Sequence, residues 1–591
     1  MTQHYRNLTP AEIEQLERQG NYAEDWSTVR VAESFSAECV RNSTFEGAVS
    51  LGTLENNRHT DGALSLREGI YNSCLCNTTV GDHPTIHNVR MLSGYTIGNN
   101  VLLFNIDEMT CDPTDPVWLE PMNENGGRRI LPFGGMTIGD AYLWARYRGR
   151  KQLMDRLEQF TRDLLASPEG RYGQLGDCCV VKNTKSLHNI IVRSSSDDPS
   201  RIDSCITLHD GVIGYGCTVE NGIIAERFLL GEHVHLEFGL RLNDTVVGDN
   251  STLARCEVGN SIIFPAHEQH HNNSFLIAGL IMGQSNIAAG GTIGSNHNSR
   301  TADNEIAGGR GFWPGLCCSF KHSSRFASYC LLAKGDYPAE LDITLPFALV
   351  NNNVSKDQLE LMPAYWWMYN MYAMDRNSKK FAKRDKRKYK AQHIEFDNLA
   401  PDTAEEILRG MKQLRAWMAA STGDTVYAQG QEKSKRPTVV LKAAEGLKAY
   451  EDMLVFYAMK YLPQLPSTRY QLDTKEWVNI GGQLVAKADM EQLIADVENG
   501  AIASWQQLHD RMDALWEAYP AQREAHAYSV LCRLAGVDHL DETLWKQYQR
   551  RYADIQAYIE EQKVVSRHKD EVNAFRNMTY WDDDERAAVL S

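Results

Sequence analysis

Apolar residues recur at six-residue intervals through much of the first 350 positions of this chain. Such a period matches neither the roughly 3.6 residues of a helical turn nor the two-residue alternation of a half-buried strand. It suits a chain that makes a short strand, turns, and makes another, so that each strand sends an apolar residue into a shared interior. We therefore predict a β-solenoid of stacked parallel strands. In its clearest run six of seven positions are apolar: Ile206, Val212, Thr218, Ile224, Leu230, Leu236 and Leu242.

The same period is present in other segments. It is found at Phe275, Ile281, Ile287 and Ile293, and towards the N-terminus at Cys39, Phe45, Leu51, Cys74, Val80, Ile86 and Leu92. Many glycines lie between the apolar positions, and glycine is a poor helix former. Glycine also suits corners, where a positive φ is often needed. The alternative of a long helix is therefore disfavoured.

Breaks in the period divide the chain. Residues 1–28 are predicted to form a helical cap, and residues 29–104 and 176–350 the two parts of the solenoid. Residues 105–175 lose the repeat and contain a helical pattern, which predicts an insertion projecting from one coil. From residue 351 glycine thins out, and helical patterns at 439–462, 503–518, 521–535 and 541–563 predict an α-helical domain over 351–591.

Charge and composition bound the function. A net charge of −16 argues against a nucleic-acid-binding body. The segment Lys379–Lys390, KKFAKRDKRKYK, is locally basic, which is typical of a charged helix face; the alternative is a surface that binds phosphate or nucleic acid, and the acidic remainder of the chain argues against nucleic acid. The N-terminus has no signal-peptide pattern, and no apolar run has the length of a membrane span. We therefore expect a cytoplasmic protein with reduced cysteines and with no nucleic-acid or membrane partner.

A dense titratable cluster, His267-Glu268-Gln269-His270-His271, precedes the second run of sixes. Histidine titrates near neutral pH, so it suits the general base that acyl transfer from a thioester to a hydroxyl or amine requires. Backbone N–H groups at the following Gly290-Gly291 pair suit the stabilisation of a developing oxyanion. The cluster therefore indicates a candidate acyl-transfer site.

The segment Met282–Asn296, MGQSNIAAGGTIGSN, resembles the hexapeptide-repeat acyltransferases. The likeness is closest to the acetyltransferase half of bifunctional glucosamine-1-phosphate acetyltransferase/uridylyltransferase. One residue is missing after Gly283, and there is an extra glycine at Gly290-Gly291. The whole chain also resembles a bacterial family of long hexapeptide-repeat proteins, which supplies no function. The matching positions are Asn286, Ile287, Gly290, Thr292, Ile293 and Asn296.

The resemblance implies a left-handed parallel β-helix and a homotrimer with active sites between subunits. It implies transfer of an acyl group, first of all acetyl, from acyl-coenzyme A to a sugar, sugar phosphate or sugar-nucleotide, with no metal. The family's catalytic histidine lies a little more than one coil before the final asparagine. His271 and His270 lie 25 and 26 residues before Asn296, so His271 is the predicted base and His270 the second candidate. The predicted substrate-binding residues are Asn296, His267, Glu268 and Asn286, and the predicted cofactor-binding residues are Gly290, Gly291, Lys321, Arg325 and Lys334.

Other functions stay open. A non-catalytic scaffold or a sugar-nucleotide-binding protein would keep the same repeats. The fold also hosts a zinc enzyme of carbonic-anhydrase type, although no spacing here forces that geometry. The side chains of suitable type for zinc are His267, Glu268, His271, His297 and His322.

Residues 1–60 contain no Gly-rich nucleotide loop, so a uridylyltransferase activity is not supported.

Overall fold

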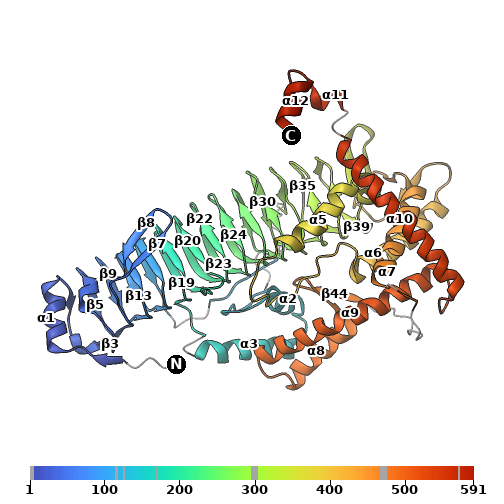
Figure 1. Cartoon of the computed structure of the whole chain (residues 1–591). Coiled ribbons are helices and arrows are strands. Elements are labelled where there is room, and N and C mark those ends of the chain that lie inside the picture. Colours follow the sequence, from blue (N-terminus) through green and yellow to red (C-terminus); the bar gives the residue numbers. More distant parts are fainter. Residues whose placement is uncertain are drawn as a thin grey trace.

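A computed structural model describes residues 5–112, 117–123, 127–167, 170–294, 304–462, 464–465, 476–569 and 573–590. Figure 1 shows a long β-solenoid that starts at the N-terminal end and makes up most of the length of the molecule. Helices cover one side of this solenoid and gather at its far end. The predicted architecture, a parallel β-helix with a helical insertion and a C-terminal helical region, is confirmed.

The strands form two long sheets, one smaller sheet and two hairpins. The 25-stranded sheet contains β1 (Tyr5–Asn7), β2 (Tyr22–Ala23), β3 (Val29–Ala32), β5 (Thr44–Glu46), β6 (Val49–Leu51), β10 (Cys74–Cys76), β11 (Thr79–Val80), β13 (Leu92–Ser93), β14 (Thr96–Ile97), β16 (Glu108–Thr110), β17 (Gln174–Leu175), β19 (Ser186–Val192), β21 (Thr207–Ile213), β23 (Ile224–Leu230), β25 (Arg241–Val247), β27 (Cys256–Gly259), β28 (Ile262–Ile263), β30 (Ser274–Ile277), β31 (Gly279–Ile281), β32 (Thr292–Ile293), β33 (Ile306–Gly308), β35 (Ser319–Phe320), β36 (Arg325–Phe326), β38 (Asp336–Tyr337) and β39 (Asp342–Ile343). The ten-stranded sheet contains β4 (Val40–Arg41), β9 (Gly69–Tyr71), β12 (Thr85–Val89), β15 (Leu102–Ile106), β18 (Val180–Lys182), β20 (Arg201–Asp203), β22 (Thr218–Glu220), β24 (His235–Glu237), β26 (Thr252–Ala254) and β29 (Glu268–Gln269). The six-stranded sheet contains β34 (Trp313–Pro314), β37 (Leu331–Leu332), β40 (Leu349–Asn353), β41 (Gln358–Met362), β42 (Val426–Ala428) and β43 (Thr438–Val440), and the hairpins are β7 (Arg58–Asp61) with β8 (Leu64–Arg67) and β44 (Trp477–Ile480) with β45 (Gln483–Ala486).

Each coil has three faces and three corners. In one coil residues 241–243 form the first face and 245–247 the second, both within β25, and residues 252–254 form the third face in β26. The three corners of this coil are Asp244, Asn250 and Arg255, with φ of 46°, 55° and 55°. Most residues avoid this left-handed region, so these three corners carry a conformational cost. The core packing in the interior of the coils offsets that cost.

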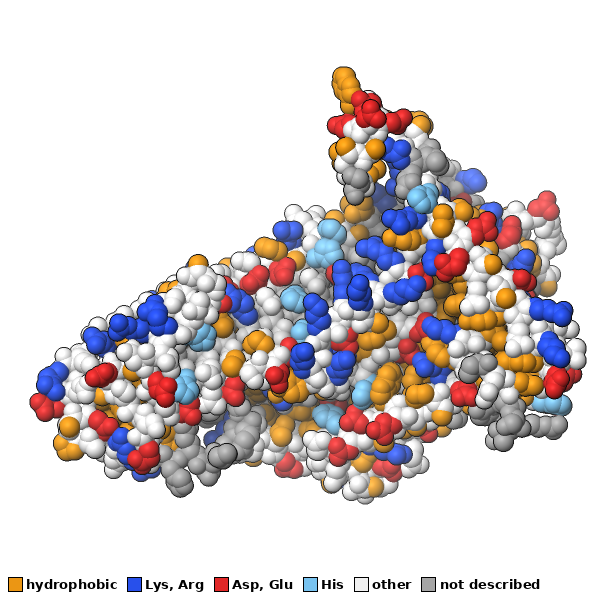
Figure 2. All heavy atoms as spheres, viewed as in Figure 1, with side chains coloured by type: hydrophobic (Ala, Val, Ile, Leu, Met, Phe, Trp, Pro, Cys, Tyr) orange, Lys and Arg blue, Asp and Glu red, His pale blue; other side chains and the backbone are white. Residues whose placement is uncertain are grey.

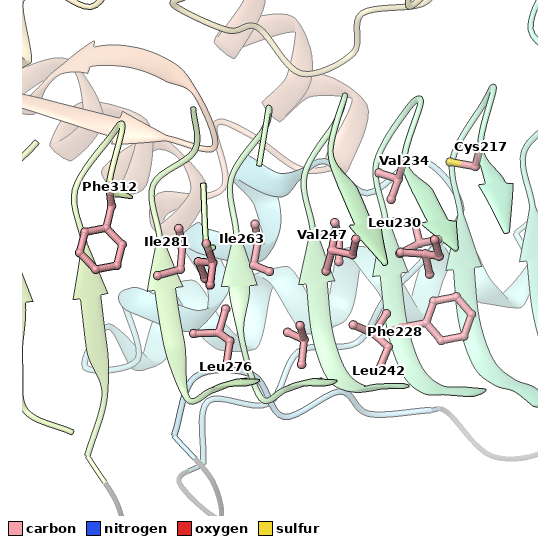
Figure 3. Packing of buried hydrophobic residues seen from close by; sticks show 14 of the residues in the cluster. Cys217, Phe228, Leu230, Val234, Leu242, Val247, Ile263, Leu276, Ile281 and Phe312 are labelled. Atoms are coloured by element: carbon pink, nitrogen blue, oxygen red, sulfur yellow. The ribbon is translucent and has the colours of Figure 1, made fainter. Parts of the chain in front are cut away.

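The coil repeat is shorter than three sixes. Thr207 pairs with Ile224, which pairs with Arg241, so that one coil takes 17 residues in this region. An unbroken six-residue register therefore slips by one position per coil. The interior positions of these coils are spaced five or six apart, and they are Leu208, Ile213, Val219, Ala225, Leu230, Leu236, Leu242, Val247 and Leu253. Figure 3 shows such residues stacked between successive strands.

Because of this slip, some of the positions that were predicted to face the interior do not. Leu230, Leu236 and Leu242 point into the solenoid as predicted. Ile206 and Ile224 instead have exposed fractions of 41% and 36%. The strands were predicted correctly, but the assumption of an exact period of six was wrong.

A second core lies outside the solenoid. On the second face, Val212, Leu229 and Val246 turn outward and are nevertheless buried. They pack in one cluster with residues of α2 (Ile138–Arg146) and α3 (Lys151–Ala166), the two helices of the insertion. A break at 147–150 separates these helices, which the sequence presented as one pattern. The insertion therefore covers the second face of the solenoid.

The C-terminal region folds back along the solenoid. Helix α5 lies against it and α8 and α9 reach the insertion helices (Figure 1). Pro520 lies inside α9, so the two helices predicted at 503–518 and 521–535 are one helix. In the described residues, the helices are too short or too polar to cross a membrane. The remaining helices are α1 (Pro10–Arg18), α4 (Tyr365–Tyr369), α5 (Met371–Arg384), α6 (Pro401–Ala420), α7 (Ala443–Tyr461), α8 (Lys487–Asn499), α9 (Trp505–Ala535), α10 (Glu542–His568), α11 (Ala574–Asn577) and α12 (Asp583–Leu590).

Candidate functional site

The predicted catalytic histidines lie at the corner that joins the third face of one coil to the first face of the next. Strand β29 ends at Gln269, residues 270–273 make the turn, and β30 begins at Ser274. Asn273 has a φ of 62°, which an asparagine tolerates better than most residues. We call residues 270–273 the histidine corner.

His267 lies inside the coil and not at this corner. Its side chain is fully buried, and its ring nitrogens contact Oγ of Ser285 at 2.8 Å and Oε1 of Gln269 at 3.2 Å. Burial lowers the pKa of His267 to about 4, so the ring is neutral at physiological pH. This histidine, predicted to bind substrate, is therefore part of the polar core.

Glu268 and His270 form a pair at the surface. Nδ1 of His270 lies 3.1 Å from Oε2 of Glu268, and the side chain of His270 is 38% exposed. The ring of His271 lies next to that of His270, with centroids 4.5 Å apart. A carboxylate on one ring nitrogen fixes the tautomer and leaves the other nitrogen able to accept a proton. This is the arrangement of a base and its orienting group.

Two cations of α5 hold the carboxylate. Oε1 of Glu268 lies 3.2 Å from Nζ of Lys380, and it accepts a hydrogen bond from Nη1 of Arg384 at 3.1 Å. Figure 2 shows Lys and Arg side chains gathered over α5, with His side chains nearby. Sequence reasoning assigned these cations no role at the site, although the basic run Lys379–Lys390 was the signal that contained them. Their position next to the histidines follows only from the folding of the C-terminal region onto the third face.

Several other predicted residues share this region. Asn286 pairs with Glu268 across neighbouring coils. The N–H of Gly290 donates to the carbonyl of Asn272, which places Gly290 and Gly291 next to the histidine corner. The N–H of Gly291 donates to the carbonyl of Ala288, so both amide groups of the pair are already used within the backbone. Both amides therefore already have acceptors, whereas an oxyanion would need them free.

The remaining predicted residues are more distant or lie outside the described part of the chain. Lys334 is exposed, and it occupies the equivalent corner several coils farther along the solenoid. Lys321 and Arg325 flank a different corner and pair with Glu340 at 3.2 Å and Asp342 at 2.8 Å. The structure therefore does not bring these two cations to the histidines. Asn296 and His297 lie outside the described residues.

A zinc centre finds no support in the described part of the chain. No group of three or more His, Cys, Asp or Glu side chains there is placed to hold a metal ion. Both ring nitrogens of His267 have protein partners. The polar chemistry of the histidine corner therefore consists of an oriented imidazole next to cations.

Comparisons with known proteins match most of this chain. Residues 5–418 match the family described as "Domain of unknown function (DUF4954)", and residues 460–585 match "Domain of unknown function (DUF6819)". A protein of Treponema pallidum (strain Nichols), described as "Uncharacterized protein", is 42% identical over 652 residues. The match covers 99% of this chain and 90% of the Treponema protein. The similarity therefore includes the solenoid, the insertion and the C-terminal helices together.

Proposed function

The chain belongs to the DUF4954 family, and we propose that within this family it is an acyltransferase of the β-helix type. The proposed reaction moves an acyl group, first of all acetyl, from acyl-coenzyme A to a sugar, sugar phosphate or sugar-nucleotide. The parallel β-helix and the Asn286–Ile293 run, which resembles the hexapeptide-repeat acyltransferases, support this class.

The observation that carries the proposal is the Glu268–His270 pair beside two cations of α5. Nε2 of His270 takes the proton of the acceptor hydroxyl or amine as that group attacks the thioester carbonyl. The carbon–sulfur bond then breaks, and the leaving thiolate receives a proton. His270 is favoured over His271 because it is the ring that contacts the carboxylate. His271 remains the second candidate.

The cations give the cofactor an anchor. Coenzyme A carries phosphates, and charge-assisted hydrogen bonds from Lys and Arg are the strong contacts that phosphates make. Lys380 and Arg384 lie next to the histidine corner, because both pair with Glu268, the residue that also contacts His270. We propose that this part of α5 binds the phosphates, and that a neighbouring copy in a homotrimer closes the open side of the corner.

The test is acceptor-dependent release of coenzyme A thiol from acetyl-coenzyme A, with a panel of sugars, sugar phosphates and sugar-nucleotides. We expect His270→Gln to lower turnover by about 10²–10⁴, the range typical of a general base. The exposed His539 is the matched control, and His539→Gln should leave turnover unchanged. Equal turnover in His270→Gln, His271→Gln and the wild type would refute the assignment. Absence of thiol release with every acceptor would favour the scaffold.

A further inference from the structure

A cavity of about 330 Å³ lies at a different corner of the solenoid from the histidines. It opens where the second face meets the third, next to Tyr215, Glu232 and Asp249. The insertion supplies a second wall through residues 133–137, and α9 with the segment 389–392 supplies the third. Four segments distant in sequence therefore enclose one space, and its volume suits a small organic molecule.

One side of the cavity is apolar. Phe133 and Trp505 contact each other with ring centroids 4.9 Å apart, and both line the space together with Leu164 and Val212. Trp505 and Val212 are buried in the core shared with the insertion helices. These side chains are therefore held in place without a ligand. They present a preformed surface for a ring or other apolar body.

The lining also contains a fixed guanidinium. Nη1 of Arg193 donates to the carbonyl of Gly134 at 3.0 Å, and Nη2 donates to the hydroxyl of Tyr215 at 2.9 Å. The guanidinium also lies 4.8 Å from the centroid of the Tyr215 ring, which stacks on Tyr389 at 4.1 Å. A Cβ on Gly135 would lie 2.8 Å from Nη1, so the glycine turn is shaped around this cation.

The charge of Arg193 is not balanced by a carboxylate. In the described part of the chain it forms no ion pair, and its guanidinium donates to a carbonyl and a phenol. The two nearby carboxylates are already engaged. Glu232 accepts the backbone N–H groups of Lys390 and Ala391 at 3.1 Å each, and Asp249 pairs with Arg387. The cavity therefore joins an apolar wall to one unbalanced positive charge.

We propose that this cavity binds a small amphipathic organic anion, with its ring against Phe133 and Trp505 and its carboxylate or phosphate on Arg193. His509 lines the same space, and its Nε2 contacts Oδ2 of Asp140 at 2.8 Å. It gives the anion a second polar neighbour next to Trp505. This site is separate from the histidine corner, so the proposal does not depend on acyl transfer.

Ligand-observed NMR on the full chain tests the site with benzoate, indole-3-carboxylate and phenyl phosphate as probes. Benzamide is the neutral isostere of benzoate. We expect the anions to bind with dissociation constants near or below about 10 mM, as small fragments do in a preformed pocket. The ranking of the carboxylates against phenyl phosphate identifies the preferred head group. Benzamide should bind at least about tenfold more weakly, a difference of about 1.4 kcal/mol.

Two variants and a control make the result specific. Arg193→Gln should weaken the anions about tenfold in protein that still unfolds cooperatively. Arg90→Gln, which alters an exposed pair with Asp107, is the control and should bind the anions like the wild type. Gln506→Trp adds a large ring at an exposed lining position and should displace the probes without a change in the core. Benzamide binding equal to that of benzoate would overturn the proposal. Full binding by both variants, or no binding of any anion at about 10 mM, would do the same.

Discussion

Asp249, at a corner of the solenoid, pairs with Arg387, which lies 138 positions later in the chain. Their side chains are only 4% and 2% exposed. Arg387 also pairs with Asp385 at 2.8 Å and donates to the carbonyl of Gln392 at 2.7 Å. One buried guanidinium thus fastens the segment after α5 to the solenoid, and it shapes the wall of the cavity as it does so.

Loss of this guanidinium should be costly. Arg387→Met leaves Asp249 and Asp385 buried without their cation, and breaking a buried pair costs about 3–5 kcal/mol. Denaturant unfolding should show a decrease of this size in the free energy of unfolding. Arg325→Met, in an exposed pair with Asp342, should cost no more than about 1 kcal/mol. Equal effects of the two substitutions would show that burial of the Arg387 pair carries no energetic weight.

His267 should make the solenoid sensitive to acid. Burial lowers its pKa to about 4, below the roughly 6.5 expected in the unfolded chain. The unfolded state therefore binds a proton first as the pH falls, so the stability from neutral His267 is present above about 6.5 and is lost towards about 4. The loss approaches about 3 kcal/mol, because one pKa unit corresponds to about 1.4 kcal/mol.

The measurement is denaturant unfolding at several pH values between about 7 and 4. His267→Gln keeps an amide that can bond to Ser285 but removes the titration, so its stability should fall less over this range. Parallel pH profiles for the wild type and His267→Gln would contradict the assignment of the acid sensitivity to this residue.

The solenoid could be predicted because its signal is local. Each coil must send apolar side chains inward at short intervals, and this pattern survives although the true coil takes 17 residues in the region of β21 to β25. The burial of the second face had a weaker signal. Val212-Ile213 and Leu229-Leu230 are adjacent apolar pairs, and adjacent apolar residues in a strand indicate burial on both sides. Those pairs pointed to a covering element.

The site was predicted only in part because its partners come from remote segments. Glu268 and His270 are neighbours in sequence, and their pairing was within reach of local reasoning. Lys380 and Arg384 lie more than 100 residues later, and no local pattern specifies that α5 packs against the third face. The same holds for the cavity, which is lined by four segments distant in sequence. The cations at the histidine corner and the walls of the cavity therefore depend on long-range packing, which local sequence patterns do not specify.

The cations of α5 should contribute to cofactor binding. The double variant Lys380→Gln, Arg384→Gln removes two charges beside Glu268, and we expect acetyl-coenzyme A to bind about 10–100-fold more weakly. Isothermal titration at two salt concentrations measures this, and the wild type should show the steeper salt dependence. Lys546→Gln, Arg415→Gln removes two exposed cations elsewhere and serves as the matched control. Identical affinity in both double variants would exclude α5 as the phosphate anchor.

The glycine at the Asp249 corner should tolerate no side chain. A Cβ on Gly231 would lie 2.0 Å from Oδ1 of Asp249 and 2.9 Å from its backbone nitrogen, in the adjacent coil. Gly231→Ala should therefore force the corner apart and cost about 1–3 kcal/mol, the usual cost of overpacking. A Cβ on Gly149, in the break between α2 and α3, would meet no neighbouring atom within 4 Å. Gly149→Ala is the control and should leave the melting temperature unchanged. Equal melting temperatures for the two variants would mean that the coils can separate at this corner without cost, and the Asp249–Arg387 contact would then not depend on their close approach.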